Sequence, residues 1–113
     1  MNTNIITLYS GDWQNIDLEF KDLNGDAITL TNCIIKFTVK DDEGNIIIEK
    51  TSNDITEIEI TDENNGLATI HIIESDSTSY EGVYEYDIQL TNVSGHDFTP
   101  IKSYLQIIKD VTI

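Results

Sequence analysis

Apolar and polar residues alternate along most of this chain in short runs, and each run ends at a cluster of turn-forming residues. In the clearest run Ile35, Phe37 and Val39 alternate with lysine and threonine. Alternation with a period of two predicts a β-strand that has one buried face and one solvated face. Runs of this kind predict about eight strands, at residues 6–8, 16–20, 35–40, 46–51, 58–60, 68–72, 82–90 and 102–108.

The segments between these runs carry the residues that turns require. Asn24-Gly25 supplies the positive φ angles of a hairpin turn, and residues 41–45 and 62–66 are similar clusters. Residues 74–80 break the alternation with polar residues, so we expect a loop or a single helical turn there. The pattern predicts an all-β protein, one antiparallel β-sandwich with Greek-key connections that occupies residues 1–113 as a single domain.

Two strands have additional features. Ile46-Ile47-Ile48 is apolar at three successive positions, which predicts a strand covered on both faces. Pro100 has no backbone N–H, so we expect that end of the last strand to lie at a sheet edge.

Composition supports the all-β assignment and excludes several classes of partner. The chain has 20 Ile and 13 Thr but 2 Ala, and β-branched residues favour strands over helices. It carries 21 Asp and Glu against six Lys and no Arg, a formal net charge of −15. Binding to nucleic acid or to an anionic membrane surface requires clustered Lys and Arg, so we expect neither partner.

Neither a signal peptide nor a membrane-spanning helix is expected. Residues 1–4 contain no cationic region followed by an apolar stretch. The longest apolar runs have three residues, whereas a spanning helix needs roughly 20. Cys33 is the single cysteine and can form no internal disulfide, which favours folding in a reducing cytoplasm.

The sequence gives little basis for catalysis. His71 occupies an outward strand position and His96 lies in a turn, and nothing in their spacing brings a nucleophile and a base together. Cys33 has no basic neighbour in sequence to lower its pKa, so we expect a small, partly buried apolar residue. The paired carboxylates lie on solvated strand faces rather than in the unequal environments that glycoside hydrolysis needs. We expect no enzyme and no catalytic residues.

One segment resembles a calcium loop without completing it. Asp22, Asn24 and Asp26 match the first three ligand positions of an EF-hand loop. The match then fails, because Ala27 stands at the glycine position and Cys33 stands at the bidentate glutamate position. A hairpin turn accounts for the Asn-Gly pair, and we expect no metal and no cofactor.

The aromatic residues divide into core and surface candidates. Tyr84 and Tyr86 share the inward register of their strand, so we expect them in the core. The other candidates would suit either a protein interface or a sugar-binding platform, because Tyr and Trp supply a large contact area at a small entropic cost. The interface residues that we predict are Trp13, Tyr80, Pro100 and Tyr104.

The order of these segments is similar to that of a known domain family. Residues 11–12 precede an alternating strand, and residues 21–31 and 35–40 follow in the family's order. The most specific piece is Gly-Val-Tyr-Glu-Tyr-Asp-Ile-Gln-Leu at residues 82–90, and residues 109–112 are similar to the closing segment. Over residues 10–112 the chain resembles the immunoglobulin-like domains of tailed-phage virion proteins, in particular the N-terminal domain of the baseplate upper protein family.

The resemblance implies a non-enzymatic phage structural protein, an accessory or attachment module that docks on the baseplate, tail, neck or capsid. The relatives continue into a fibre or host-binding part, whereas this chain ends at Ile113. Attachment or decoration is therefore expected, rather than receptor binding. The implied partners are other virion proteins, with homo-oligomers in the assembled particle. The implied location is the virion, and the host cytoplasm during assembly.

Two other classes of function stay open. A carbohydrate- or surface-binding module would show exposed aromatic residues clustered on one face. An acidic DNA mimic that inhibits a host nucleic-acid-binding protein would show one continuous acidic face.

Overall fold

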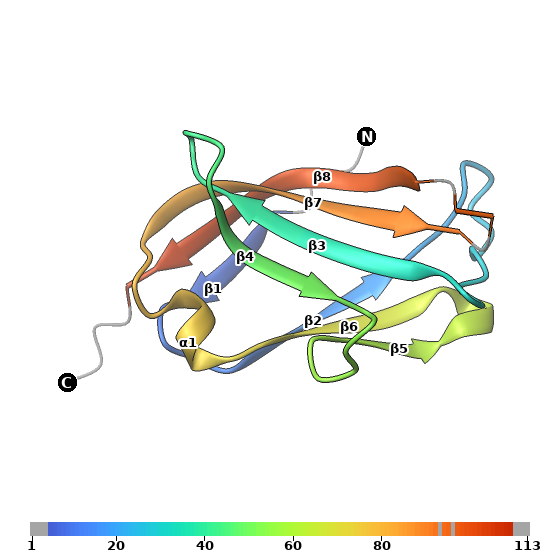
Figure 1. Ribbon diagram of the computed structural model, residues 1–113, viewed down its shortest axis with the longest axis horizontal. Helices are drawn as coiled ribbons and strands as arrows, with labels where there is room; N and C mark the ends of the chain where they lie inside the picture. The colour runs from blue at the N-terminus through green and yellow to red at the C-terminus, as the bar shows by residue number, and fades with distance from the viewer. Residues whose placement is uncertain (1–4, 93, 96, 110–113) are drawn as a thin grey trace.

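A computed structural model describes residues 5–92, 94–95 and 97–109, which form eight strands (Figure 1). A helical turn, α1 (Glu74–Ser77), and a 3-10 turn, η1 (Glu63–Asn65), interrupt the strands. Over these ranges no helix is long and apolar enough to span a membrane. The strands are β1 (Ile6–Tyr9), β2 (Gln14–Glu19), β3 (Ile34–Lys40), β4 (Ile46–Thr51), β5 (Ile58–Asp62), β6 (Leu67–Ile72), β7 (Gly82–Thr91) and β8 (Asp97–Ile108).

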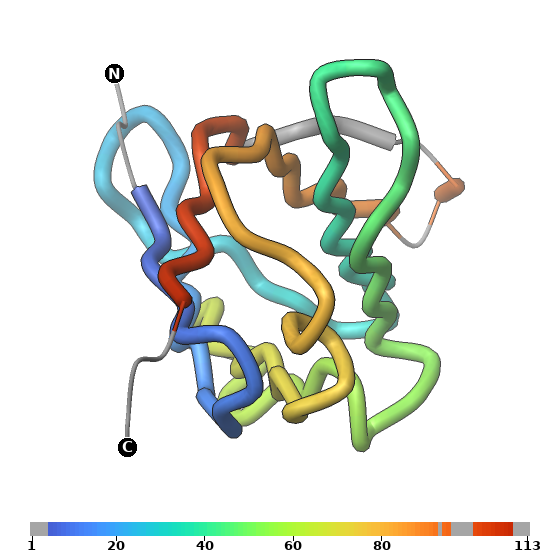
Figure 2. Tube along the Cα trace, turned by 90° about the vertical axis from the view of Figure 1, so that its left-hand side faces the viewer, coloured from blue at the N-terminus to red at the C-terminus, as the bar shows by residue number. Residues whose placement is uncertain are grey.

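The strands form two sheets that stack as two layers. One sheet has five strands in the order β1-β8-β7-β3-β4, and the other has three in the order β2-β6-β5. The five-stranded sheet is the upper layer in Figure 1. Figure 2 looks onto one end of the sandwich, where the segment from α1 into β7, yellow to orange, crosses between the layers. The predicted all-β sandwich of about eight strands, with a helical turn at residues 74–80, is confirmed.

The connections are those of an immunoglobulin-like fold. Four crossings between the sheets place β2, β5 and β6 in one layer and β3, β7 and β8 in the other, the division that immunoglobulin-like Greek-key sandwiches show. These folds also contain a tyrosine corner at the start of the strand before the last. Here the Tyr84 hydroxyl donates a hydrogen bond to the carbonyl oxygen of Glu81 at 2.9 Å, at the start of β7.

One strand pair departs from the antiparallel prediction. β1 runs parallel to β8, with Ile6 opposite Leu105 and Tyr9 opposite Ile108. The other strand pairs are antiparallel. Alternation indicates which side chains of β1 are buried, but it does not indicate the strand's partner or direction.

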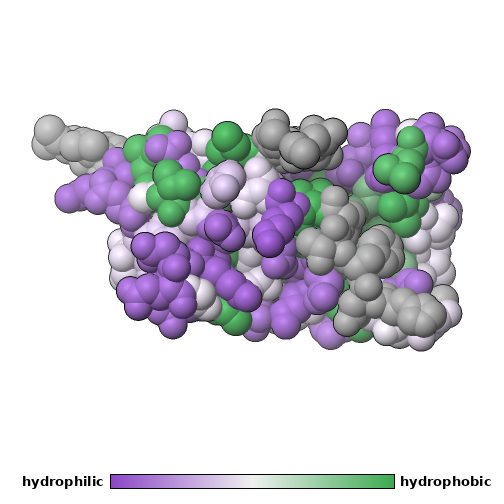
Figure 3. Space-filling view, turned by 90° about the horizontal axis from the view of Figure 1, so that it is seen from above, coloured by the Kyte–Doolittle hydropathy of each residue, from purple (hydrophilic) through white to green (hydrophobic). Residues whose placement is uncertain are grey.

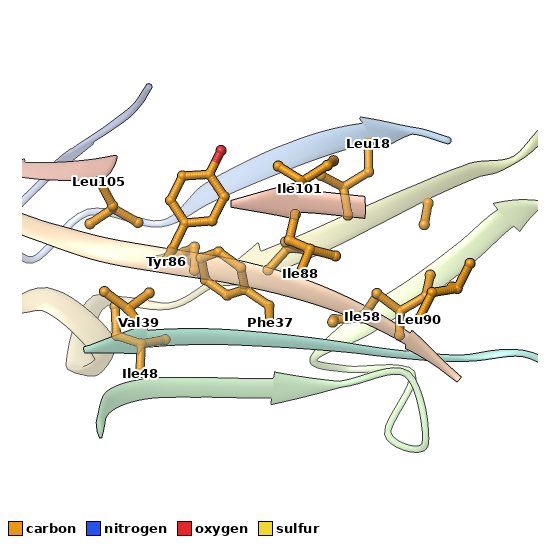
Figure 4. Packing of buried hydrophobic residues seen from close by; sticks show 14 of the residues in the cluster. Leu18, Phe37, Val39, Ile48, Ile58, Tyr86, Ile88, Leu90, Ile101 and Leu105 are labelled. Carbon is orange, nitrogen blue, oxygen red and sulfur yellow. The ribbon is translucent and has the colours of Figure 1, made fainter. Parts of the chain in front are cut away.

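The core lies between the two sheets, and every strand contributes to it. Phe37 on β3 and Tyr86 on β7 pack with ring centroids 5.7 Å apart and planes at 49° (Figure 4). In antibody domains the equivalent region holds a disulfide against a tryptophan. The aromatic pair fills it here, and burial raises the pKa of Tyr86. Other buried core residues include Leu8, Leu18, Phe20, Leu30, Ile35, Val39, Ile48, Ile58, Ile70, Ile72, Ile88, Leu90, Leu105 and Ile107.

The isoleucine run in β4 is covered on one face only. Ile48 is buried, but Ile46 is 54% exposed, so the prediction of two covered faces is wrong. β4 is an edge strand, and its pairing with β3 is interrupted by a bulge at Val39/Lys40 that leaves Ile47 as the extra residue.

The last strand begins earlier than predicted, at Asp97, and contains a bulge around Pro100. Residues 88–90 of β7 face residues 98–101 of β8, so β8 has one more residue than β7 over this stretch. A bulge is one of the few strand positions that tolerate proline. Because β1 pairs with residues 105–108 only, the Pro100 end of β8 has a strand neighbour on one side alone among the described residues, as predicted.

The turn between β5 and β6 requires a glycine. The Asp62 carboxylate accepts a hydrogen bond from the backbone N–H of Asn65 at 3.3 Å, and Gly66 follows with a φ of 69°. A Cβ atom at Gly66 would lie 2.6 Å from the carbonyl oxygen of Phe20 and 2.8 Å from that of Ile28. Two backbone segments therefore approach this residue more closely than a side chain allows.

We expect Gly66→Ala to lower the free energy of unfolding more than Gly44→Ala. Gly44 also has a positive φ, 84°, but nothing lies within 4 Å of its added Cβ, so the substitution carries only the left-handed backbone cost of about 1–2 kcal/mol. Gly66→Ala adds a clash with two carbonyl groups, for a total of roughly 3 kcal/mol or more. Urea unfolding of both variants measures the difference, and equal losses would contradict the role assigned to close approach.

Candidate functional site

The predicted interface residues lie on separate surfaces. Trp13 directly precedes β2, whereas Tyr104 faces outward from β8 in the five-stranded sheet. Tyr80 is half-buried and packs edge-on against Tyr84, with ring centroids 6.2 Å apart. Pro100 lies within β8, at the bulge. Trp13, Tyr80 and Tyr104 line three different hollows, so the structure does not bring them into one site.

The hollow beside Trp13 is the candidate site, and we call it the Trp13 groove. Its volume is about 520 Å³, and the start of β2, the 52–57 loop and the end of β6 enclose it. Trp13 is 73% exposed and Ile55 is 66% exposed, so two large apolar side chains stand in solvent at its walls. The residues that line it include Trp13, Asn15, Lys50, Ile55, Glu57 and His71.

Hydrogen bonds to α1 hold the chain just before Trp13. The backbone N–H of Gly11 donates to the Ser77 hydroxyl oxygen at 2.9 Å, and the Ser10 hydroxyl donates to the Ser77 carbonyl oxygen at 2.9 Å. Ser77 is fully buried, and Gly11 turns the chain with a φ of 82°. Trp13 therefore projects from a connection that is anchored to the end of the sandwich.

The 52–57 loop presents Ile55 through a local carboxylate turn. The Asp54 side chain accepts hydrogen bonds from the hydroxyl of Thr56 at 2.6 Å and from its backbone N–H at 2.9 Å. These hydrogen bonds, first the one from the hydroxyl, hold the pKa of Asp54 below its usual value. The Glu57 carboxylate accepts the backbone N–H of Thr51 at 3.0 Å, which closes the loop.

His71 supplies a polar wall of the groove. Its Nδ1 lies 2.9 Å from the Asn15 side-chain oxygen, and its Nε2 lies 3.6 Å from a Glu59 carboxylate oxygen. These three residues come from β6, β2 and β5, so the row crosses the whole three-stranded sheet. The outward position predicted for His71 is confirmed, and its side chain is half-buried against its neighbours.

Lys50 is a buried cation at the same groove. It is 6% exposed, and its Nζ lies 2.6 Å from Asp76 Oδ2. Asp76 also accepts the backbone N–H of Ile73 at 2.8 Å, so the pair connects β4 to α1. Lysine is seldom buried without a partner. The sequence register could have indicated that Lys50 is buried, because Lys50 stands two residues after the inward Ile48.

The other candidate chemistry finds a structural explanation. Cys33 is half-buried against the core, and burial raises the pKa of its thiol, opposite to what a nucleophile needs. The Asp22 carboxylate accepts the backbone N–H groups of Asn24 and Asp26 at 2.9 and 3.0 Å, which are turn contacts. Within the described part of the chain, no group of three His, Cys, Asp or Glu side chains could hold a metal. His96 lies outside the described residues.

The comparisons with known proteins concern the fold. No protein-family model and no curated protein sequence matches this chain. The crystal structure of CopC from Methylosinus trichosporium OB3b is similar with a TM-score of 0.52 at 13% identity, covering 96% of this chain and 89% of that chain. The Lin-41 filamin domain gives a TM-score of 0.49 at 18% identity, covering 89% and 81%.

The strand order and the connections between the two sheets define a class, the immunoglobulin-like β-sandwiches, which confirms that part of the predicted resemblance. Identities this low carry no information about ligand or partner. Nothing in the matches links the chain to phage virion proteins, and that part of the resemblance rests on the sequence alone.

We expect Asp76→Ala to destabilise the protein more than Lys50→Met. The first leaves a buried ammonium without a partner, at a cost of about 3–5 kcal/mol. The second keeps the apolar stem, and the remaining carboxylate is 18% exposed and retains the Ile73 N–H, so the expected loss is about 1–2 kcal/mol. Urea unfolding measures both.

A double-mutant cycle is the control for this pair. We expect the double variant to lose at least about 1 kcal/mol less than the sum of the single losses, because the two side chains are in contact. Additive losses, or an Asp76→Ala variant that is no less stable than Lys50→Met, would show that the pair is not coupled.

Proposed function

We propose that this protein is a non-enzymatic binding module that serves as an accessory or attachment subunit of a tailed-phage particle. The resemblance of residues 10–112 to immunoglobulin-like domains of phage virion proteins supports the virion role. In this proposal the subunit docks through the Trp13 groove onto another virion protein. The protein would be made in the host cytoplasm and function in the assembled particle.

The observation that carries the proposal is the exposure of Trp13 and Ile55 on the walls of one groove. Tryptophan is the residue type most enriched among those that dominate binding energy at protein interfaces. Such residues work best where surrounding contacts exclude water, and polar residues stand next to Trp13 to form that rim. A partner side chain inserted between Trp13 and Ile55 would bury both.

The charge of the protein fits a subunit that is stored free and then docked. A formal charge of −15 on 113 residues keeps the free protein soluble and opposes non-specific aggregation. Docking through an apolar groove does not depend on that charge, so soluble storage and assembly do not conflict.

The same groove favours one alternative, a carbohydrate-binding module. A sugar ring can stack on the exposed indole of Trp13, while its hydroxyl groups meet the Asn15 amide, the Glu57 carboxylate and the His71 ring. Such a site mixes an apolar platform with both donors and acceptors, as small-molecule sites do.

We expect mass spectrometry of purified phage particles, from a lysate of the host that carries the gene, to find this protein at a fixed copy number. A copy number that is a multiple of three, five or six would follow from the symmetry of a tail, capsid or baseplate. Clear absence from intact particles would overturn the virion role.

Trp13→Ala tests the docking surface. We expect purified variant protein to bind particles that lack the native subunit about 30-fold more weakly, the equivalent of about 2 kcal/mol for a dominant interface residue. Leu23→Ala is the matched control, because Leu23 is an exposed apolar residue in the turn after β2 and away from the groove. Equal binding of the two variants to the particles would exclude the groove as the docking surface. If soluble oligosaccharide abolished the binding of the wild-type protein to the particles, the carbohydrate-binding alternative would be favoured.

A further inference from the structure

We propose that the outer face of the five-stranded sheet is the contact surface between two copies of this chain. This outer sheet face consists of the outward side chains of β1, β8, β7, β3 and β4, and Figure 3 looks onto it. It is separate from the Trp13 groove, so the proposal goes beyond the docking function given above.

The side chains that the structure describes on the outer sheet face balance in charge. They include three lysines and three acidic residues, and the strand register sets them beside one another. In the strand register Lys40 lies opposite Glu85 across β3 and β7, and Asp87 lies opposite Lys102 across β7 and β8. Lys36 Nζ lies 3.3 Å from Glu49 Oε2.

That balance distinguishes this face from the rest of the molecule. The six described charges of this face sum to zero, so together they add nothing to the formal charge of −15. The outer face of the three-stranded sheet, for comparison, holds Asp17, Glu19 and Glu59 with His71 as its one basic group among the described strand residues. Two copies brought together there would place acid against acid, which is destabilising. Over the balanced face, a second copy would not meet such an excess of acidic side chains.

Exposed apolar side chains lie at both edges of the balanced face. Ile5, Val83 and Tyr104 are 63%, 65% and 53% exposed and line one hollow of about 330 Å³ over β1, β7 and β8. At the opposite edge Ile46 on β4 is also exposed, opposite Lys40. In Figure 3 green apolar residues are visible among purple polar ones on this face.

One row of residues shows why a second copy suits this face. The register runs from Tyr104 to Glu85, then to Lys40 and Ile46, so apolar groups flank a charge pair. A row of this kind is complementary to another copy of itself, because each apolar end meets an apolar end or the stem of a lysine, and each charge meets its opposite. A partner of net positive charge would instead be drawn to the acidic faces elsewhere.

The face is large enough for a stable contact. The five strands β1, β8, β7, β3 and β4 have 4, 12, 10, 7 and 6 residues, and each residue covers about 16 Å² at a rise of about 3.3 Å and a strand spacing of about 4.8 Å. Together they present about 600 Å², which is at the lower end of the area that each partner contributes to a standard interface. Such interfaces give dissociation constants in the micromolar range or tighter.

Lys40→Glu is the decisive variant. It changes the sum of the six described charges from zero to −2, so we expect the dimer dissociation constant in sedimentation equilibrium to rise at least tenfold. Lys21→Glu is the matched control, since it makes the same change in total charge at an exposed residue after β2, outside the face. It should leave the dissociation constant within about threefold of wild type.

The charge-swapped variant Lys40→Glu/Glu85→Lys separates a lost contact from a damaged fold. It restores neutrality and the cross-strand pair, and we expect dimerisation to return. A wild-type protein that stays monomeric at about 100 µM in about 150 mM salt would overturn the proposal. So would equal effects of Lys40→Glu and Lys21→Glu. Trp13→Ala should leave the dimer intact, so a failure of the proposed docking function can be distinguished from a failure of the proposed dimer.

Discussion

The alignment of β3 with β7 is the constraint on which both the core and the outer sheet face of this protein depend. Phe37 and Tyr86 can pack together in the core only when these strands keep their register. A slip of one residue would turn every side chain of a strand to the other face. The same alignment sets Lys40 beside Glu85 on the outside. Core packing therefore determines the pattern of charge on the outer sheet face, although the two sets of residues never touch.

A single helical turn carries out a second task. Through Ser77, α1 holds the connection that leads from β1 to Trp13, and through Asp76 it holds Lys50 of β4. Two adjacent residues thus tie the β1–β2 connection and the edge strand β4 to the end of the sandwich. In a fold of this size that function often falls to a disulfide, which one cysteine cannot supply. Polar contacts of buried side chains replace it.

Much of the fold could be predicted from alternation, because each strand buries one face. The inward registers of β3, β6 and β7 followed from Phe37, Ile70 and Tyr86 and their neighbours. The edge strand β4 behaved otherwise, since a bulge exposed Ile46 and an ion pair let Lys50 be buried. Neither effect is local in sequence. The exposure of Trp13 and Tyr104 was foreseeable from their positions, but their separation on two surfaces depends on which sheet each strand joins.

The parallel pairing of β1 with β8 has a consequence for how the chain is made. Ile6 pairs with Leu105, so nearly the whole sequence separates the two partners. β1 leaves the ribosome first and β8 emerges last, and contacts between such distant segments form slowly because a long loop must close. Hairpins such as β3–β4 can form during translation, but the five-stranded sheet cannot be completed until the final strand arrives. Synthesis of β8 thus closes the fold, and a chain cut short before β8 would leave both β1 and one edge of β7 open to the wrong partner.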